Sequence, residues 1–238
     1  SPLLGRGVRH RTKRLLSLVA RRHAVNVTTP TPSLPAHDNP TVVRLFEAAA
    51  DAFADKGFHA TTTRDIASRA GLSPAGVYVH FASKEDLLFQ LSRVGHEGAR
   101  DALAAAAAEA GSPTDALQEV ISAFARWHAE QHQVARIVQY EFRHLSPDHQ
   151  REVLTLRREI DGVVEAIISD GVATGEFAVS DVRATALAAL SLVVDVARWY
   201  HPGIKRTTPA SIAQTYGALA LRLVGARVSG RGGVREMR

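Results

Sequence analysis

Between residues 62 and 84 the sequence places side chains that can bind a nucleic-acid backbone beside residues too small to obstruct it. Tyr78, His80 and Lys84 offer hydrogen-bond donors of the kind that contact phosphate oxygens. The preceding run Pro74–Gly76 carries little side-chain bulk. A helix that begins with these residues could bring its backbone close to the base edges in a DNA groove. The chemistry predicted for this stretch is DNA binding.

The local sequence also predicts the elements that position these side chains. In each of three places, a hydroxyl residue that can cap a helix is followed by an acidic residue or a proline suited to the first turn. The pairs are Thr62 with Asp65, Ser73 with Pro74, and Ser83 with Asp86. Gly71 supplies a turn between the first two helices, with Ala67 and Val77 at the spacing of a helix-turn-helix. An ordinary helical hairpin with a glycine turn is the alternative.

Beyond this stretch, apolar residues recur at intervals of three and four, and no strand-like alternation persists, so we expect an all-α fold. Further helices should begin at caps followed by proline or acid, and glycines should mark helix ends. The expected caps are Ser112, Ser146, Ser180 and Thr208, and the expected end positions are Gly111, Gly171, Gly175, Gly203 and Gly225. Prolines between residues 30 and 40 exclude a continuous helix there.

Composition narrows the class of partner and the compartment. The 238 residues are 45% hydrophobic and 22% charged, with a net charge of +5 and a pI near 10.0, which favours an anionic partner such as nucleic acid. There is no cysteine, which excludes disulfides, thiolate zinc sites and thiol nucleophiles and fits a reducing compartment. No apolar run is long enough for a membrane span and no signal-peptide core is present, so we expect a cytoplasmic protein.

The run GFHATTTRDIASRAGLSPAGVYVHFASKEDLL, residues 57–88, strongly resembles the DNA-binding signature of TetR-family transcriptional regulators. The resemblance is close over about residues 41–91 and rests elsewhere on helix pattern alone. It implies an N-terminal three-helix DNA-binding domain with a helix-turn-helix, followed by a larger helical domain that binds an effector and dimerises. We therefore expect a basic arm and proline-rich linker at 1–39, the DNA-binding domain at 40–91, the larger domain at 92–226 and a basic tail at 227–238.

Carried over residue by residue, the resemblance implies a set of DNA contacts: Thr62, Thr63, Arg64, Ser73, Pro74, Ala75, Gly76, Tyr78, His80 and Lys84. Residues 62–64 would lie near phosphates, residues 73–76 would meet base edges or backbone, and the last three would hold phosphates. Many relatives carry lysine, glycine and threonine where this chain has residues 74–76. We therefore expect apolar contacts and DNA shape to contribute more to sequence recognition than direct hydrogen bonds to the bases do.

Polar residues that interrupt apolar helices are the candidates for an effector pocket, because buried polar groups need partners. They are Trp127, His128, Gln139, Tyr140, Arg143, Asp195, Arg198 and Trp199. Asp195 and Arg198, one helical turn apart, could instead pair with each other. The stretches YEFRHLSPDH and ARWYHPG look similar to TetR-family members associated with acyl-CoA thioesters. An acyl-CoA would need an apolar channel and cations such as Arg126, Arg136, Arg143 or Arg198 for its phosphates.

The last two helices are expected at residues 180–200 and 209–224. The first is apolar nearly all round, which indicates burial on both faces. The resemblance implies that both form a four-helix bundle with a second copy, and a core within one chain is the alternative. The resemblance also implies that the protein represses transcription by binding a palindromic operator and that a hydrophobic effector releases it.

Other classes of protein remain as alternatives. His128, Glu130 and His132 could bind zinc on one helix face, but no HExxH run accompanies them, and we expect no metal. The sequence shows no phosphate loop, dinucleotide fingerprint or nucleophile motif, so we expect neither a cofactor nor enzymatic activity. An architectural nucleic-acid-binding protein that works through the arginines of residues 6–22, and an efflux-pump regulator that senses hydrophobic drugs, are the other functions considered.

Overall fold

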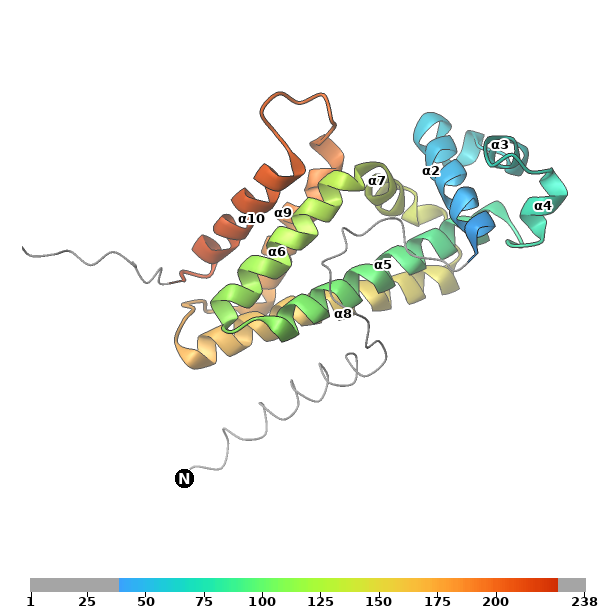
Figure 1. Cartoon of the computed structure of the whole chain (residues 1–238). Helices are drawn as coiled ribbons and strands as arrows, with labels where there is room; N and C mark the ends of the chain where they lie inside the picture. The colour runs from blue at the N-terminus through green and yellow to red at the C-terminus, as the bar shows by residue number, and fades with distance from the viewer. Residues whose placement is uncertain (1–38, 227–238) are drawn as a thin grey trace, which may run out of the picture.

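The computed structural model describes residues 39–226, and the predicted basic arm, linker and C-terminal tail lie outside these residues. Between residues 39 and 226 all regular elements are helices (Figure 1), so the predicted all-α fold is confirmed. A small helical domain lies at one end of the molecule, and a larger one, built around two long helices, forms the rest. None of the described helices combines the length and apolar character that crossing a bilayer requires.

The small domain consists of α2 (Pro40–Ala60), α3 (Thr63–Arg69) and α4 (Pro74–Tyr78). The predicted caps are confirmed: the side chain of Thr62 accepts from Asp65 N, and that of Ser73 accepts from Gly76 N. Gly71 takes a φ of +67°, a left-handed conformation that glycine adopts without strain, and it turns the chain between α3 and α4. Helix α4 ends at Tyr78.

Helix α5 (Lys84–Glu109) belongs to both domains. Its first turns contribute Leu87, Leu88 and Leu91 to the apolar core of the small domain, and its last turns contribute Leu103 to the core of the larger one. The boundary predicted between residues 91 and 92 therefore falls inside a continuous helix. A rigid helix shared in this way can transmit a displacement from one domain to the other.

The larger domain continues with six elements. They are α6 (Pro113–Glu130), α7 (His132–Tyr140), the 3₁₀ helix η1 (Phe142–His144), α8 (Pro147–Thr174), α9 (Val182–Trp199) and α10 (Pro209–Leu223). The caps predicted at Ser112, Ser146 and Thr208 are confirmed. The cap of α9 is Asp181, not Ser180, because its carboxylate accepts from Ala184 N at 2.9 Å.

Two glycines predicted to end helices, Gly171 and Gly175, have different roles in the structure. Gly175 ends α8 in a left-handed conformation with a φ of +78°, as expected. Gly171 lies inside α8 and does not end it, so that prediction is wrong. The ring of Phe177 packs directly on Gly171, where an added Cβ would lie 2.0 Å from Phe177 Cδ2.

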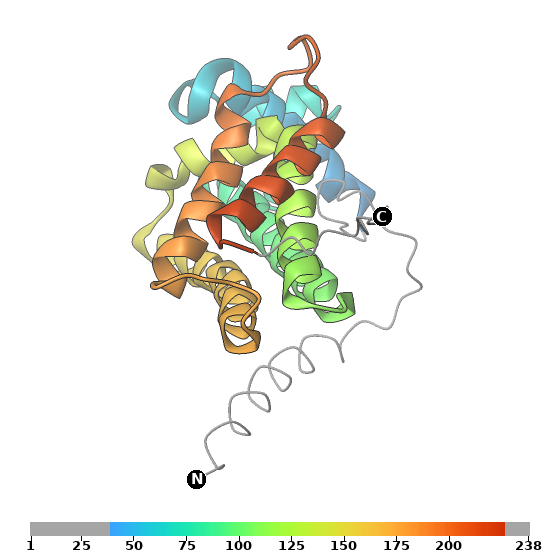
Figure 2. The ribbon, with the colours of Figure 1, turned by 90° about the vertical axis from the view of Figure 1, so that its left-hand side faces the viewer.

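Helices α9 and α10 lie side by side on one side of the larger domain, with α6 packed against both (Figure 2). In the single chain, α9 buries only its inner face, with Leu190 and Val193 in the core. Leu187 and Leu192 on other sides of α9 are 60% and 50% exposed. The prediction that this helix is buried on both faces is therefore wrong for one chain taken alone.

Candidate functional site

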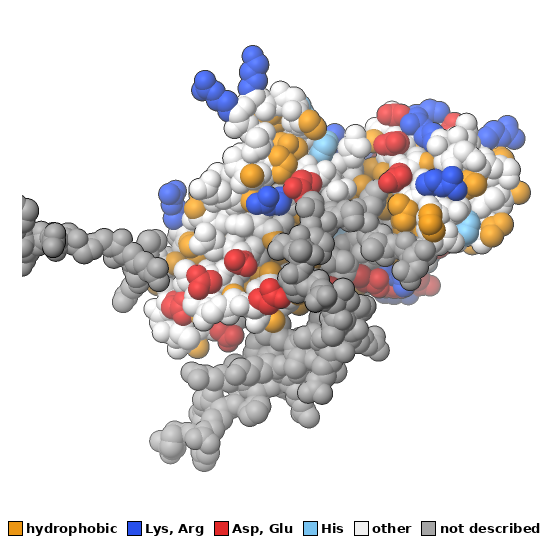
Figure 3. Space-filling view, viewed as in Figure 1, with side chains coloured by type: hydrophobic (Ala, Val, Ile, Leu, Met, Phe, Trp, Pro, Cys, Tyr) orange, Lys and Arg blue, Asp and Glu red, His pale blue; other side chains and the backbone are white. Residues whose placement is uncertain are grey.

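The predicted DNA-contacting residues lie on and around α3 and α4, at the end of the molecule farthest from α10 (Figure 1). Arg64, Ser73, Pro74 and Ala75 are exposed, and Tyr78 is 55% exposed. In Figure 3, basic side chains extend from this end with acidic ones among them, and further acidic side chains gather on the same face near the connection of α5 and α6. This surface therefore suits an anionic polymer at the helix-turn-helix end.

Two contacts fix the geometry of α3 and α4. The hydroxyl groups of Thr63 and Tyr78 lie 3.1 Å apart, which joins the start of α3 to the end of α4. Thr62 donates to Asp65 through its backbone N at 2.9 Å and its hydroxyl at 2.7 Å. These bonds, with a further one from Lys56, hold the pKa of the Asp65 carboxyl well below its usual range. Thr62 is thus engaged in capping, while Arg64 has no ion-pair partner among the described residues.

Gly76 within α4 and His80 just after it are two further predicted DNA contacts. A Cβ added to Gly76 would meet Leu72 and Ser73 at 3.6 Å, an ordinary contact, so the fold itself does not require glycine there. His80 is half-buried after the end of α4, with its ring 6.5 Å from that of Phe81. Both remain predicted DNA contacts.

Lys84 has a role that the sequence did not predict. Its ammonium donates to Phe58 O at 2.5 Å, to Thr61 O at 2.7 Å and to His59 O at 3.4 Å, and it lies 4.3 Å from the centre of the Phe58 ring. These carbonyls belong to the C-terminal end of α2, where a cation is favourable. Burial lowers the pKa of Lys84. In the described structure the three donors of the ammonium are used by this helix-capping contact, which argues against the predicted phosphate contact.

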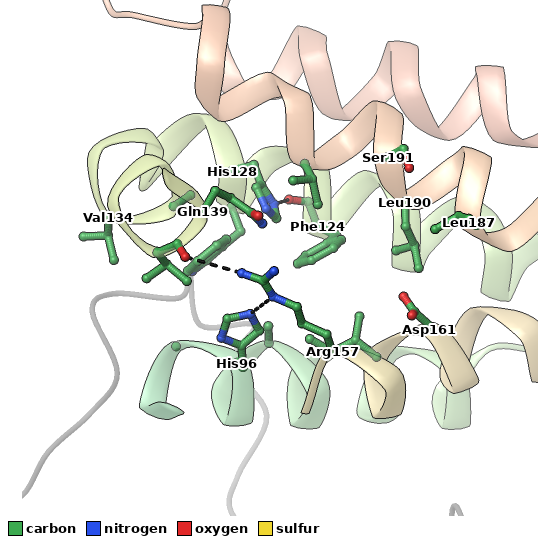
Figure 4. A pocket seen from close by; sticks show the side chains of 17 residues that line it. His96, Phe124, His128, Val134, Gln139, Arg157, Asp161, Leu187, Leu190 and Ser191 are labelled. Carbon is green, nitrogen blue, oxygen red and sulfur yellow. Dashed lines mark hydrogen bonds between the residues drawn. The ribbon is translucent and has the colours of Figure 1, made fainter. Parts of the chain in front are cut away.

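A cavity of about 350 Å³ lies inside the larger domain, walled by α5, α6, α7, α8 and α9 (Figure 4). Its walls are mainly apolar, with Phe124 from α6 and Leu190 from α9 among them. Three of the predicted effector-binding residues line it: Trp127, His128 and Gln139. All three lie on α6 and α7.

The other five predicted residues do not line this cavity, so the prediction of one shared pocket is corrected. Tyr140 is 51% exposed, and Arg143 is an exposed residue beside His144. Arg198 donates to both carboxylate oxygens of Asp195, at 2.6 and 2.8 Å, which confirms the predicted pairing on the surface of α9. Trp199 packs against the core of the larger domain. The spacing of polar residues in a helix does not reveal which of them face one another across helices.

The four arginines considered for a coenzyme also lie apart from the cavity lining. Arg136 donates to the carbonyls of Ala197 at 3.2 Å and Arg198 at 3.3 Å, which fastens α7 to the end of α9. Arg126 is exposed on α6. Of these arginines, Arg136 has a structural role that its contacts explain.

The sequence analysis missed Arg157, the main polar group of the cavity. Its side chain projects from α8 into the space between His96 and Phe124 (Figure 4). Its Nε donates to His96 Nε2 at 3.2 Å, and its Nη2 donates to Val138 O at 3.4 Å. A signal was present, because Arg157 lies in the same stripe of α8 as the buried residues Val153 and Ile160.

The charge of Arg157 is not neutralised by a direct partner. No carboxylate of the described residues lies within ion-pair distance of its guanidinium. Burial lowers its pKa and the charge of Asp161 opposes that change, yet a guanidinium stays protonated at neutral pH. Burial, reinforced by the nearby charge of Glu165, raises the pKa of Asp161, a second lining residue. The cavity therefore offers a cation to an electronegative group of a ligand.

Helix α7 connects the cavity to the DNA-binding domain. Val134 and Val138 line the cavity and also belong to the apolar core that contains Leu45 and Phe46 of α2. The chain after α7 makes polar contacts with the same domain: Glu85 at the start of α5 accepts from Ser146 N and from the His149 ring, both at 2.8 Å. A ligand that moves α7 must therefore disturb the packing of α2.

No group of three or more His, Asp or Glu side chains between residues 39 and 226 is arranged to hold a metal ion. His128 and His132, considered as zinc ligands, direct Nδ1 to carbonyls of their own segment, Phe124 O at 2.9 Å and Ala129 O at 3.0 Å.

Comparisons with known proteins give the same organisation. Residues 45–91 match the family described as bacterial regulatory proteins of the tetR family, and residues 110–224 match the tetracyclin repressor-like C-terminal domain. The chain is 32% identical over 195 residues to the HTH-type transcriptional repressor KstR2 of Mycolicibacterium smegmatis, covering 80% of this chain and 92% of that protein.

Solved structures are similar over comparable lengths. A tetR-family regulatory protein from Rhodococcus RHA1 is 40% identical with a TM-score of 0.74, over 79% of this chain and 99% of that one. FadR from Bacillus subtilis in complex with stearoyl-CoA is 20% identical with a TM-score of 0.64, over 76% of this chain and 97% of that one, and shares the fold. These matches, together with the helix-turn-helix and the helical domain that follows it, show that the chain belongs to the TetR family of bacterial regulatory proteins.

Proposed function

We propose that this protein is a transcriptional repressor that binds a palindromic operator as a homodimer in the cytoplasm and leaves it when an acyl-CoA enters the larger domain. The observation that carries the proposal is the cavity: a half-buried arginine without a carboxylate partner stands among apolar walls, and one wall, α7, packs on the DNA-binding domain.

The exposed end of α4 supports DNA binding. Pro74 and Ala75 are exposed and small, and Tyr78 is held beside them by its bond to Thr63. A helix presented in this way can enter a major groove with its N-terminal residues toward the bases. In two copies related by a two-fold axis, such helices meet successive major grooves about 34–36 Å apart, which is why the operator is proposed to be palindromic.

The outer sides of α9 and α10 support dimerisation. Leu192 on α9, and Leu219 and Leu223 on α10, are between 38% and 50% exposed in the single chain. Exposed leucines on two neighbouring helices form an apolar surface that a partner would cover. A second copy that contributes the same two helices would complete a four-helix bundle.

The size and polarity of the cavity support an acyl thioester as the effector. Its volume of about 350 Å³ is near the lower end of the range for small-molecule pockets, so it can hold an acyl group but not the nucleotide of a coenzyme A as well. The apolar walls suit the hydrocarbon, and Arg157 suits the carbonyl oxygen at the thioester end. KstR2 and FadR, whose names indicate steroid or fatty-acid regulation or a bound acyl-CoA, agree with this class.

A ligand can release the operator only if it binds more tightly to the state that does not bind DNA. Arg157 donates to the carbonyl of Val138 on α7, and a ligand oxygen that attracts the guanidinium would compete with that contact. The competition would shift α7 and hence α2, which packs against it. Coupling free energies of about 1–3 kcal/mol are typical of such systems.

The test is a release experiment on an operator selected by the protein from a random-sequence library. Fluorescence anisotropy of the labelled operator is followed while acyl-CoAs of increasing chain length are added, with free coenzyme A as the control. Release by acyl-CoA and not by coenzyme A supports the proposal. Release by hydrophobic drugs alone would favour an efflux-pump regulator, and equal binding to all sequences without release would favour an architectural protein.

A further inference from the structure

His128 is a buried polar side chain of the cavity that makes no hydrogen bond with Arg157. It lies on α6 with 3% of its surface exposed, and it lines the cavity. Its ring packs against those of Phe124 and Trp127, with centroids 4.3 and 5.0 Å away. These contacts fix the orientation of the imidazole relative to the cavity.

The hydrogen bond of one ring nitrogen determines what the other can do. His128 Nδ1 lies 2.9 Å from the carbonyl oxygen of Phe124, which can only accept, so Nδ1 carries the proton. Burial, with the backbone bond opposing it, lowers the pKa of His128 to about 4, and the ring is neutral at pH 7. Nε2 is therefore a hydrogen-bond acceptor, and no described residue donates to it.

His96 shows the same arrangement in completed form. Its Nδ1 lies 2.7 Å from Ser92 O, burial lowers its pKa to about 4, and its Nε2 accepts from Arg157 Nε at 3.2 Å. The chain thus supplies a donor to one of the two neutral histidines that line the cavity and leaves the other without one (Figure 4). His128 Nε2 is not among the fully buried atoms that lack a partner, so it is open to the cavity, where a donor of a bound ligand can reach it.

We propose that His128 Nε2 accepts a hydrogen bond from a hydroxyl group of the effector, so that the cavity selects a hydroxylated acyl group over the unsubstituted one. The inference rests on the proposed function, since both concern the same cavity. Arg157 then donates to an oxygen of the ligand, and His128 accepts from a hydroxyl group of the same ligand. The two residues read groups of opposite hydrogen-bonding sense.

The surroundings favour a neutral donor. The Arg157 guanidinium would repel a cationic donor such as an amine, and burial raises the pKa of Asp161, the acid in the same lining, which disfavours the charge that would attract such a donor. Gln139 also lines it, and its amide makes no hydrogen bond with His128 in the described structure. A Gln139→Leu variant removes this amide as an alternative donor and should leave the hydroxyl preference intact.

The first test compares matched ligands. Decanoyl-CoA, 2-hydroxydecanoyl-CoA and 3-hydroxydecanoyl-CoA are titrated into the full chain while fluorescence is recorded, since Trp127 lines the cavity. At least one hydroxylated ligand should bind about 10-fold more tightly than decanoyl-CoA, the factor expected of one net hydrogen bond. His128→Phe should abolish that preference. His132→Phe is the matched control, because His132 also directs Nδ1 to a nearby carbonyl but does not line the cavity.

A second test does not depend on coenzyme A. Nitrogen-15 NMR of the histidine rings should show the Nδ1-protonated tautomer for His128 in the free protein. Adding 1-octanol should move the Nε2 resonance, and adding its methyl ether should not. If both fill the cavity without moving that resonance, if the proton is on Nε2, or if no hydroxylated probe binds, the inference is wrong. If 1-octanol gives the shift while no acyl-CoA binds, His128 accepts from a hydroxyl group but the acyl-CoA proposal and the selection of a hydroxylated acyl group fail.

Discussion

Replacing Arg157 by methionine tests the cavity with little disturbance of the fold. The change removes two long hydrogen bonds, 3.2 Å to His96 and 3.4 Å to Val138 O; it leaves His96 Nε2 without its donor but leaves no carboxylate without a partner. Methionine retains the apolar part of the side chain and removes a charge that is costly to bury. We therefore expect the melting temperature of Arg157→Met to stay within a few degrees of the wild type.

Ligand affinity should respond much more strongly. A hydrogen bond from a charged donor contributes about 1.5–3 kcal/mol, which corresponds to a loss of about 10- to 150-fold in acyl-CoA affinity. The variant also lacks the contact with Val138 O that the ligand is proposed to break, so operator affinity without ligand should fall, and further release should need higher ligand concentrations. Arg158→Met is the matched control, since the neighbouring arginine is exposed and bonds only to Leu154 O and Thr155 within its own helix. Wild-type ligand affinity in Arg157→Met would refute the role assigned to this residue.

Four further results are expected. Ala75→Leu adds bulk to the exposed start of α4 and should weaken operator binding more than binding to random DNA in anisotropy titrations; equal losses would argue against a position at the bases. Lys84→Met should lower the free energy of unfolding by about 1–3 kcal/mol through loss of the α2 cap, while the salt dependence of DNA binding is retained. Because burial lowers the pKa of His128 from 6.5 to about 4, the unfolded chain gains a proton first as pH falls, so stability should drop by up to about 1.4 kcal/mol per pH unit across that window. In denaturant titrations His128→Phe should lose less stability over the same range, and an identical pH profile would contradict the assignment. Leu192→Arg should convert a dimer to a monomer in analytical ultracentrifugation, and an unchanged mass would place the interface elsewhere.

Features set by neighbouring residues could be predicted from the sequence. The caps at Thr62 and Ser73 depend on a hydroxyl and a backbone N–H three residues later, and the turn at Gly71 depends on its own backbone conformation. Gly175 ended its helix for the same local reason, whereas the role of Gly171 depends on a ring six residues away that packs back onto α8. Capping and turn residues therefore located most helices, and they failed where a contact with a residue beyond the helix determines the structure.

The candidate site was only partly predictable because it is assembled from five helices. His128 and Gln139 were found as polar interruptions of apolar patterns. Arg157 was missed because it stands beside Arg158, and two adjacent arginines are typical of a solvated helix face. Lys84 was assigned to phosphate because the sequence cannot show that the end of α2 returns to meet it across 23 residues or more. Contacts across helices decided each of these cases.

The central claim is that the cavity and the operator surface are energetically linked, and reciprocal titration tests it most directly. The affinity of an acyl-CoA that releases the operator is measured by calorimetry with and without saturating operator DNA. The account predicts that DNA weakens ligand binding by the same factor by which ligand weakens DNA binding, about 5- to 150-fold for a typical coupling. Equal ligand affinity with and without the operator would contradict it, even if the cavity were filled.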